Sequence, residues 1–128
     1  MNAKPVWIFA LLACFLLLSS PILAHHSAAE YDMTKISSVV GTVTQFAWTN
    51  PHPYIYIEVK NDKGEVEKWI GELPALPTIA RIGWTRNSVK PGDQITMFGN
   101  RAKDGRFQLR LDKITLPNGQ DLMSSRVN

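Results

Sequence analysis

The sequence predicts a small, mainly β domain: a five-stranded barrel with one short helix between the third and fourth strands, preceded by a cleavable signal peptide. Three observations lead to this fold class. An apolar run stands near the start of the chain, strand-like alternation recurs between turn residues through most of the remainder, and one short stretch in the middle has helical spacing.

Residues 1–24 have the composition of a secretory signal peptide. Lys4 supplies the charged start, Val6 to Leu18 form an apolar run that is short for a membrane span, and Ala24 is a small residue at the expected cut. Cleavage after Ala24 makes His25 the first residue of the mature protein.

Three alternatives to this cut stay open. Cleavage after Ala28 or Ala29 would remove the histidines at positions 25 and 26. The stretch from Leu11 to Cys14 resembles a weak lipoprotein box. The apolar run could also remain as an uncleaved anchor, although it is short for that purpose.

The remaining residues, 25–128, are enough for one domain. The whole chain has 14 Lys and Arg against 11 Asp and Glu, and losing Lys4 leaves 13 against 11, a net charge near +2. These charges are scattered without a basic block, so nucleic acid is not expected as a partner. The one cysteine, Cys14, lies in the signal peptide, and an exported domain without disulfides is typical of the bacterial periplasm. We expect the mature protein there, with no membrane segment.

The barrel is expected over residues 39–123, after an irregular, extended N-terminal segment at 25–38. The first strand, Val39 to Trp48, is rich in β-branched and aromatic residues. Tyr54 to Val59 alternates apolar and polar side chains, and a turn at residues 61–64 leads back into a third strand, Glu65 to Gly71. These strands form a meander.

A short helix and two further strands are expected after the meander. Pro77 suits a helix start, and Gly83 suits the cap that ends it. Strands then follow at Gln94 to Phe98 and at Phe107 to Asp112, and residues 124–128 are expected to fray. Three strands, a helix and two strands is the element order of an OB-like barrel.

Several motifs follow one another in an order that is familiar from one family. They are His25-His26-Ser27, Gly41-Thr42-Val43, Trp48-Thr49-Asn50-Pro51-His52, Lys90-Pro91-Gly92-Asp93 and Ile114-Thr115-Leu116-Pro117-Asn118-Gly119. This succession resembles the DUF6152 family of secreted bacterial domains of unknown function, and it covers essentially the whole mature chain. The resemblance implies a periplasmic β-rich domain with a His-His start and an Asn-Pro-His motif, and it implies no activity.

The histidines form the candidate metal site, and the chain contains only His25, His26 and His52. An N-terminal histidine chelates through its amine and its ring. A third nitrogen from His52, on the loop between the first two strands, would complete a nitrogen-rich, T-shaped site that suits Cu(II). Alternatively, His26 binds with the amine and the preceding amide, or His25 and His26 are solvated residues and His52 caps a proline-rich turn.

Aromatic side chains form a second candidate site. Tyr54, Tyr56 and Trp69 are expected to share one face of the meander, where they could stack against a sugar, a peptide or a partner protein. The competing interpretation is that the barrel packs these rings inside. The acidic side chains of the second and third strands are expected on a solvated outer face: Glu58, Glu65, Glu67 and Glu72.

The sequence therefore predicts a non-enzymatic periplasmic binding protein. It contains no nucleophile elbow, phosphate-binding loop or convincing Ser-His-Asp set. Copper held by His25 and His52, with His26 in support, is the specific hypothesis, and a metal-independent interaction module on the aromatic face is the alternative. The expected partners are a metal ion or a periplasmic protein.

Overall fold

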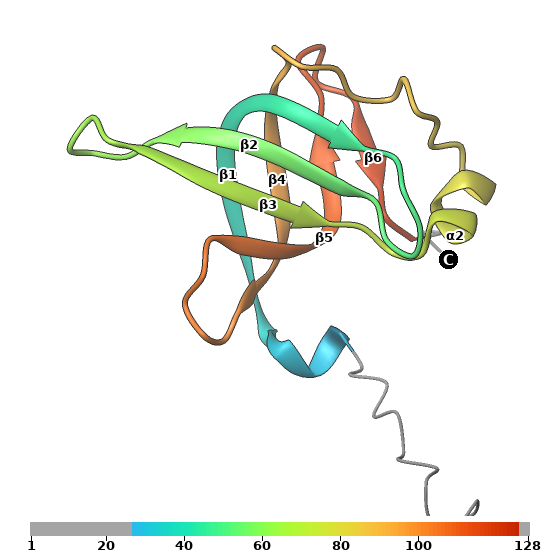
Figure 1. The fold of residues 1–128 in the computed structure, drawn as a ribbon, viewed down its shortest axis with the longest axis horizontal. Helices are drawn as coiled ribbons and strands as arrows, with labels where there is room; N and C mark the ends of the chain where they lie inside the picture. Colours follow the sequence, from blue (N-terminus) through green and yellow to red (C-terminus); the bar gives the residue numbers. More distant parts are fainter. Residues whose placement is uncertain (1–26, 126–128) are drawn as a thin grey trace, which may run out of the picture.

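The structure is a computed structural model that describes residues 27–125, so the expected signal peptide, His25 and His26 lie outside the described residues. The elements in chain order are η1 (Ser27–Glu30), β1 (Tyr31–Ala47), β2 (Tyr54–Lys60), β3 (Val66–Glu72), α2 (Leu76–Arg81), β4 (Gln94–Ala102), β5 (Gln108–Thr115) and β6 (Asp121–Met123) (Figure 1). In this part of the chain, no helix is both long enough and apolar enough to span a membrane.

The strands form one sheet that closes into a barrel. Neighbours in the order β3-β2-β1-β4-β5-β6 are antiparallel, and a parallel pairing between β3 and β5 closes a ring of five strands. With α2 between β3 and β4, this confirms the OB-like barrel. The short β6 is an addition that the sequence did not predict, because three residues are too few to show alternation.

Strand β1 begins at Tyr31, well before the position that the sequence predicted. Residues 25–38 were expected to be irregular because this stretch is polar and contains several alanines. The early half of β1 is held by buried Asn100, whose Nδ2 donates to the carbonyl oxygens of Asp32 at 2.9 Å and Lys35 at 3.0 Å. These bonds span the register shift between β1 and β4.

The C-terminal end also differs from the expectation. Residues 124–128 were expected to fray, but Ser124 is buried and its N–H donates to the carbonyl of Asp112 at 2.8 Å. Residues 126–128 lie outside the described residues.

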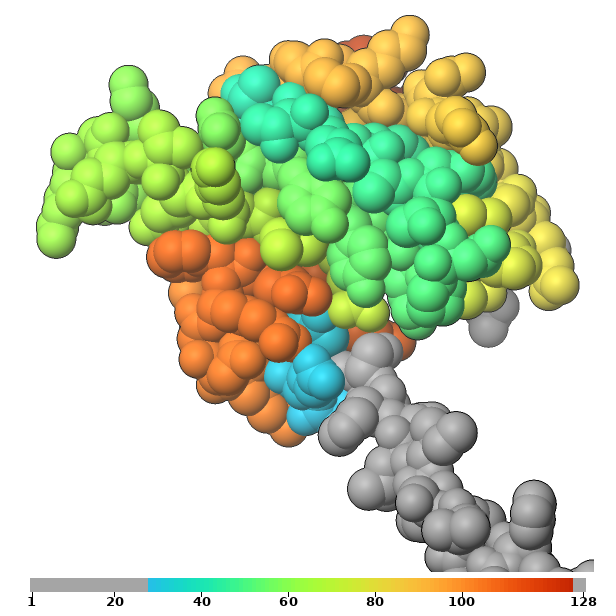
Figure 2. All heavy atoms as spheres, viewed as in Figure 1, coloured from blue at the N-terminus to red at the C-terminus, as the bar shows by residue number. Residues whose placement is uncertain are grey.

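Apolar side chains that alternate along the strands fill the barrel. Helix α2 covers one end with Ile79, and the β2–β3 hairpin projects beyond the body of the molecule (Figures 1 and 2). The buried hydrophobic cluster comprises Val43, Ile55, Ile57, Trp69, Leu73, Ile79, Trp84, Val89, Ile95, Met97, Leu109, Leu111 and Ile114.

Candidate functional site

His52 lies on the loop between β1 and β2, which the fold fixes at one end of the barrel. The two prolines beside it accept backbone hydrogen bonds: the Pro51 carbonyl from the N–H of Leu76 at 3.1 Å, and the Pro53 carbonyl from the N–H of Leu73 at 3.0 Å. Proline has no N–H of its own for a ladder, so this stretch leaves the sheet. It is held instead against the connection between β3 and α2.

The hydrogen bond of the His52 ring determines its tautomer. Nδ1 lies 2.9 Å from the carbonyl oxygen of Leu73. A carbonyl only accepts, so Nδ1 donates its proton, and in the neutral ring the lone pair is on Nε2. The side chain is 30% exposed, so the ring is accessible from solvent. A neutral imidazole with its lone pair on Nε2 is the form that ligates a metal ion.

A buried carboxylate stands behind the ring. Oε1 of Glu72 lies 3.8 Å from Nδ1 of His52, and the Glu72 side chain is only 10% exposed. Its Oε2 accepts hydrogen bonds from the Tyr31 hydroxyl and from Nε2 of Gln108, the latter at 3.3 Å. Gln108 also donates to the Tyr31 hydroxyl oxygen at 2.6 Å. We call these four residues, Tyr31, His52, Glu72 and Gln108, the His52 cluster.

The electrostatics of the cluster keep its hydroxyl protonated. Burial, followed by the hydrogen bond to Glu72 and the charge of that carboxylate, raises the pKa of Tyr31 well above its usual range. Partial burial and the same carboxylate also raise the pKa of Tyr54, which lies opposite Glu72 on β2. Tyr31 is therefore a fixed donor that orients the carboxylate beside His52.

The sequence did not reveal this cluster. It predicted a solvated Glu72, whereas the residue is 7% exposed. It also placed Tyr31 in an irregular segment. The burial arises because β3 ends where β5 pairs with it in parallel, bringing Gln108 and Arg110 alongside. The hydrophobic pattern of either strand alone carries no signal of that pairing.

The described chain begins beside the cluster. Ser27 is separated from Tyr31 by one turn of 3-10 helix, a rise of about 8 Å at ~2.0 Å per residue. His25 and His26 directly precede Ser27 and lie outside the described residues; each can add at most ~3.5 Å.

The described residues do not form a complete metal site by themselves. Between residues 27 and 125, no group of three or more His, Cys, Asp or Glu side chains could hold a metal ion. His52 and Glu72 are a pair, so a metal at His52 requires donors from elsewhere in the chain.

The aromatic candidates are separated by the sheet. Tyr54 and Tyr56 lie on the outer face of β2 with ring centroids 6.4 Å apart. Trp69 is opposite Ile57 on the inner face and is 6% exposed, so the prediction that it shares the face of the tyrosines is wrong. The alternation of β3 turns Trp69 inward, where Phe107 covers it at a centroid distance of 5.1 Å.

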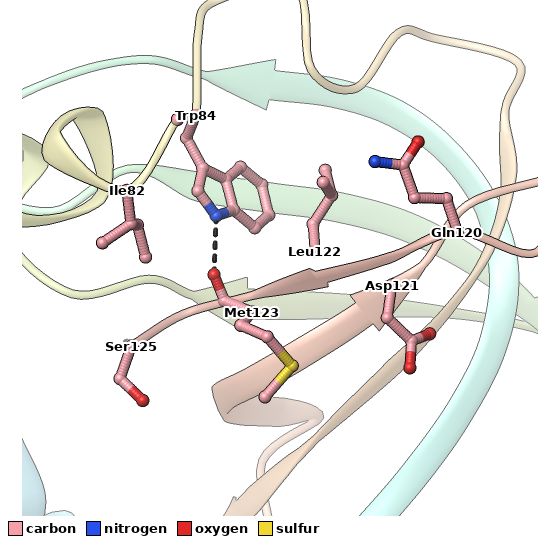
Figure 3. Close-up of a pocket in the computed structure, with 8 residues that line it drawn as sticks. Ile82, Trp84, Gln120, Asp121, Leu122, Met123 and Ser125 are labelled. Atoms are coloured by element: carbon pink, nitrogen blue, oxygen red, sulfur yellow. Dashed lines mark hydrogen bonds between the residues drawn. The ribbon is translucent and has the colours of Figure 1, made fainter. Parts of the chain in front are cut away.

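A separate hollow of about 580 Å³ lies between the end of α2 and β6 (Figure 3). Trp84 lines it, and the indole N–H donates to the carbonyl of Met123 at 2.8 Å. Asp121 also lines it but is paired with Lys113 at 2.6 Å. The hollow contains none of the site residues that the sequence predicted.

Comparison with known proteins identifies the family. The model of DUF6152, a family of unknown function, matches residues 13–109. The chain belongs to the DUF6152 family. This confirms the predicted resemblance to the family. No curated protein matches the chain.

One solved structure with a similar fold is the crystal structure of the mitochondrial single-stranded DNA-binding protein Rim1 from S. cerevisiae. Its TM-score is 0.50 at 16% identity, and the match covers 65% of this chain and 93% of that chain. The prediction that excluded nucleic acid as a partner is contradicted by this finding. It rested on scattered charge and on the expected export, whereas barrels of this type bind single strands through exposed aromatic rings as well as basic grooves. At this identity the similarity shows the shared fold alone.

Proposed function

We propose that this chain is an exported, non-enzymatic binding protein of the bacterial periplasm that holds Cu(II) between its N-terminal histidine and His52. The supporting observation is the bond from Nδ1 of His52 to the Leu73 carbonyl, which leaves Nε2 free as a ligand. Tyr31, the first residue of β1, is linked to this imidazole through Glu72.

The donor set suits copper better than other common metals. His25 would supply its amine and its ring, and His52 would supply Nε2, while His26 supports the site from the adjacent position. Nitrogen-rich sites favour Cu(II), and structural zinc would need four protein ligands. Such a site sequesters or delivers the ion.

Glu72 would act behind the ligand. Its carboxylate oxygen Oε1 lies 3.8 Å from Nδ1 of His52. The Leu73 carbonyl accepts the Nδ1 hydrogen bond, and the nearby negative charge of Glu72 favours a cation at the ring. Tyr31 and Gln108 hold the carboxylate in position, so the buried pair is part of the proposed site.

Affinity measurements on the exported protein test this proposal. The full chain is expressed with its own leader, the product is sequenced from its N-terminus, and Cu(II) affinity is measured by competition with a chelator. We expect His25 as the first residue, a loss of at least ~10-fold for His52→Ala, and a loss of ~10-fold for Glu72→Gln. Tyr54→Phe changes no nitrogen donor and is the control.

Two results would refute the copper site. One is a mature protein that begins at Ala29 or Glu30, because both N-terminal histidines are then missing. The other is an unchanged affinity in His52→Ala, which would confine copper to the terminus without any help from the fold.

The tyrosine pair supports a second candidate, a metal-independent interaction module. Tyr54 and Tyr56 are half-buried on the outer face of β2, next to the His52 cluster. Stacking on such rings contributes ~1–3 kcal/mol per base in proteins that bind single strands. Fluorescence anisotropy of a labelled single-stranded oligonucleotide, without copper, tests this role. Binding that Tyr56→Ala weakens at least ~5-fold supports it, and binding that is absent or unaffected contradicts it for this ligand.

A further inference from the structure

Strand β1 has an edge without a neighbouring strand. Residues 36–42 of β1 pair with β4, whereas its pairing with β2 covers only residues 42–47. Between residues 36 and 41, therefore, only one side of β1 has a partner strand within the described chain. The β2–β3 hairpin, which would otherwise continue the pairing, projects away from the barrel (Figure 1).

The hydrogen bonds of Val43 show which backbone groups face this edge. The Val43 N–H donates to the carbonyl of Asp93 at 2.8 Å, and its carbonyl accepts from the N–H of Gly92 at 2.8 Å. The backbone groups of Val43 therefore face the β4 side. The backbone N–H and C=O groups of successive residues in a strand point alternately to one side and to the other. The register between β1 and β4 is regular from residue 36 to 42, so this alternation continues unbroken there. The N–H and C=O groups of residues 36, 38 and 40 thus face the free edge.

Nothing in the sequence of this edge protects it from pairing. Natural proteins blunt an exposed edge with charged residues, proline or a bulge. Residues 36–43 contain no charge and no proline. Ile36 and Val40 are each 53% exposed, so the edge also presents apolar side chains to solvent.

We propose that this edge is an interface with a second copy of the chain, in which the two β1 strands pair antiparallel about a twofold axis at Ser38. In that register Ile36 lies opposite Val40 of the second copy, and Val40 lies opposite Ile36. The backbone N–H and C=O groups of residues 36, 38 and 40 then form two hydrogen bonds with the opposing residue of the second copy. The edge is uncharged and matches itself, which favours a second copy over a foreign peptide.

Molecular mass in solution tests this interface. Sedimentation equilibrium of the exported full-length product, over a range of concentrations, should show a dimer. The I36K/V40K variant places lysine opposite lysine and should be monomeric, as should I36E/V40E for the same reason. Val66→Lys is the control: Val66 is 58% exposed on the projecting hairpin, and this variant should remain dimeric.

Mixing the two charged variants separates loss of the interface from loss of the fold. In the mixture each glutamate lies opposite a lysine, so the dimer should return, which unfolded chains could not achieve. If the charged variants do not fold, Ser38→Pro replaces them. It removes only an N–H that faces the free edge, and it should also give a monomer. A wild-type protein that is monomeric at all concentrations, or a dimer that survives I36K/V40K and Ser38→Pro, would overturn the proposal. The outcome does not depend on copper.

Discussion

Tyr31 connects the start of the described chain to the site. It is fully buried, and its hydroxyl donates to a carboxylate that is itself nearly buried. Because its pKa is raised, the hydroxyl remains a donor throughout the ordinary pH range. The residue therefore contributes both to the stability of the barrel and to the position of Glu72.

Removing this hydroxyl should be costly. Tyr31→Phe keeps the ring but leaves Oε2 of Glu72 with Gln108 as its remaining donor within the described chain. Loss of a partner to a buried charged group costs about 1–3 kcal/mol. We expect the free energy of unfolding at pH 7, measured in urea, to fall by this amount. Tyr54→Phe, whose ring is more exposed, should change it little, and equal losses in both variants would argue against the specific role of Tyr31.

The same residue should make stability depend on alkaline pH. The folded-state pKa of Tyr31 lies above its ordinary value of about 10, so the unfolded chain releases the proton first. The stabilisation is fully present below that value and is lost as pH rises towards the folded-state pKa. The difference in unfolding free energy between wild type and Tyr31→Phe should therefore shrink from pH 9 to pH 11. A constant difference across urea titrations in this range would contradict the assignment.

At the scale of elements, the backbones of β4 and β5 approach each other closely at Gly99. Strand β4 changes register between Phe98 and Gly99 as it passes β5. A Cβ at Gly99 would lie 2.0 Å from the carbonyl oxygen of Arg110, and a backbone atom cannot move away as a side chain can. Glycine is therefore required at this crossing.

Gly99→Ala should destabilise the protein by at least ~1–3 kcal/mol, the usual cost of overpacking. Thermal unfolding followed by circular dichroism measures the effect. Gln94→Ala, at the exposed start of the same strand, is the matched control and should melt near the wild-type temperature. Equal melting temperatures for Gly99→Ala and wild type would show that the close approach of Gly99 to the backbone of Arg110 does not require glycine.

The strands and the helix could be predicted where each carries its own local signal. Alternation identified the β2–β3 hairpin, and Pro77 with Gly83 bracketed the helix. The first half of β1 has no such signal, because Asn100, far away in the sequence, holds it. The face of Trp69 was assigned wrongly because aromatic content does not indicate which side of a strand is buried.

At the scale of the whole molecule, the candidate site was predictable only in part. His52 stood out because histidine is rare in this chain, and its position between two prolines placed it on a loop. Its neighbours Tyr31, Glu72 and Gln108 come from three other places in the sequence. They meet because β3 and β5 close the barrel, and closure is a property of the assembled sheet.

In the proposed site, copper binding depends on export, because the N-terminal histidine exists only after cleavage. A cut after Ala24 would create the N-terminal histidine, and the fold would supply the second imidazole. The proposed donor set is complete only when both are present, so the processed protein should bind Cu(II) most tightly. The unprocessed chain and any shorter product would bind less tightly.

The most direct test of the proposed site is the electron paramagnetic resonance spectrum of the exported protein with one equivalent of Cu(II), recorded beside that of His52→Ala. We expect nitrogen hyperfine coupling in both, with one nitrogen fewer and a shifted g value in the variant. Identical spectra would contradict a folded copper site at His52.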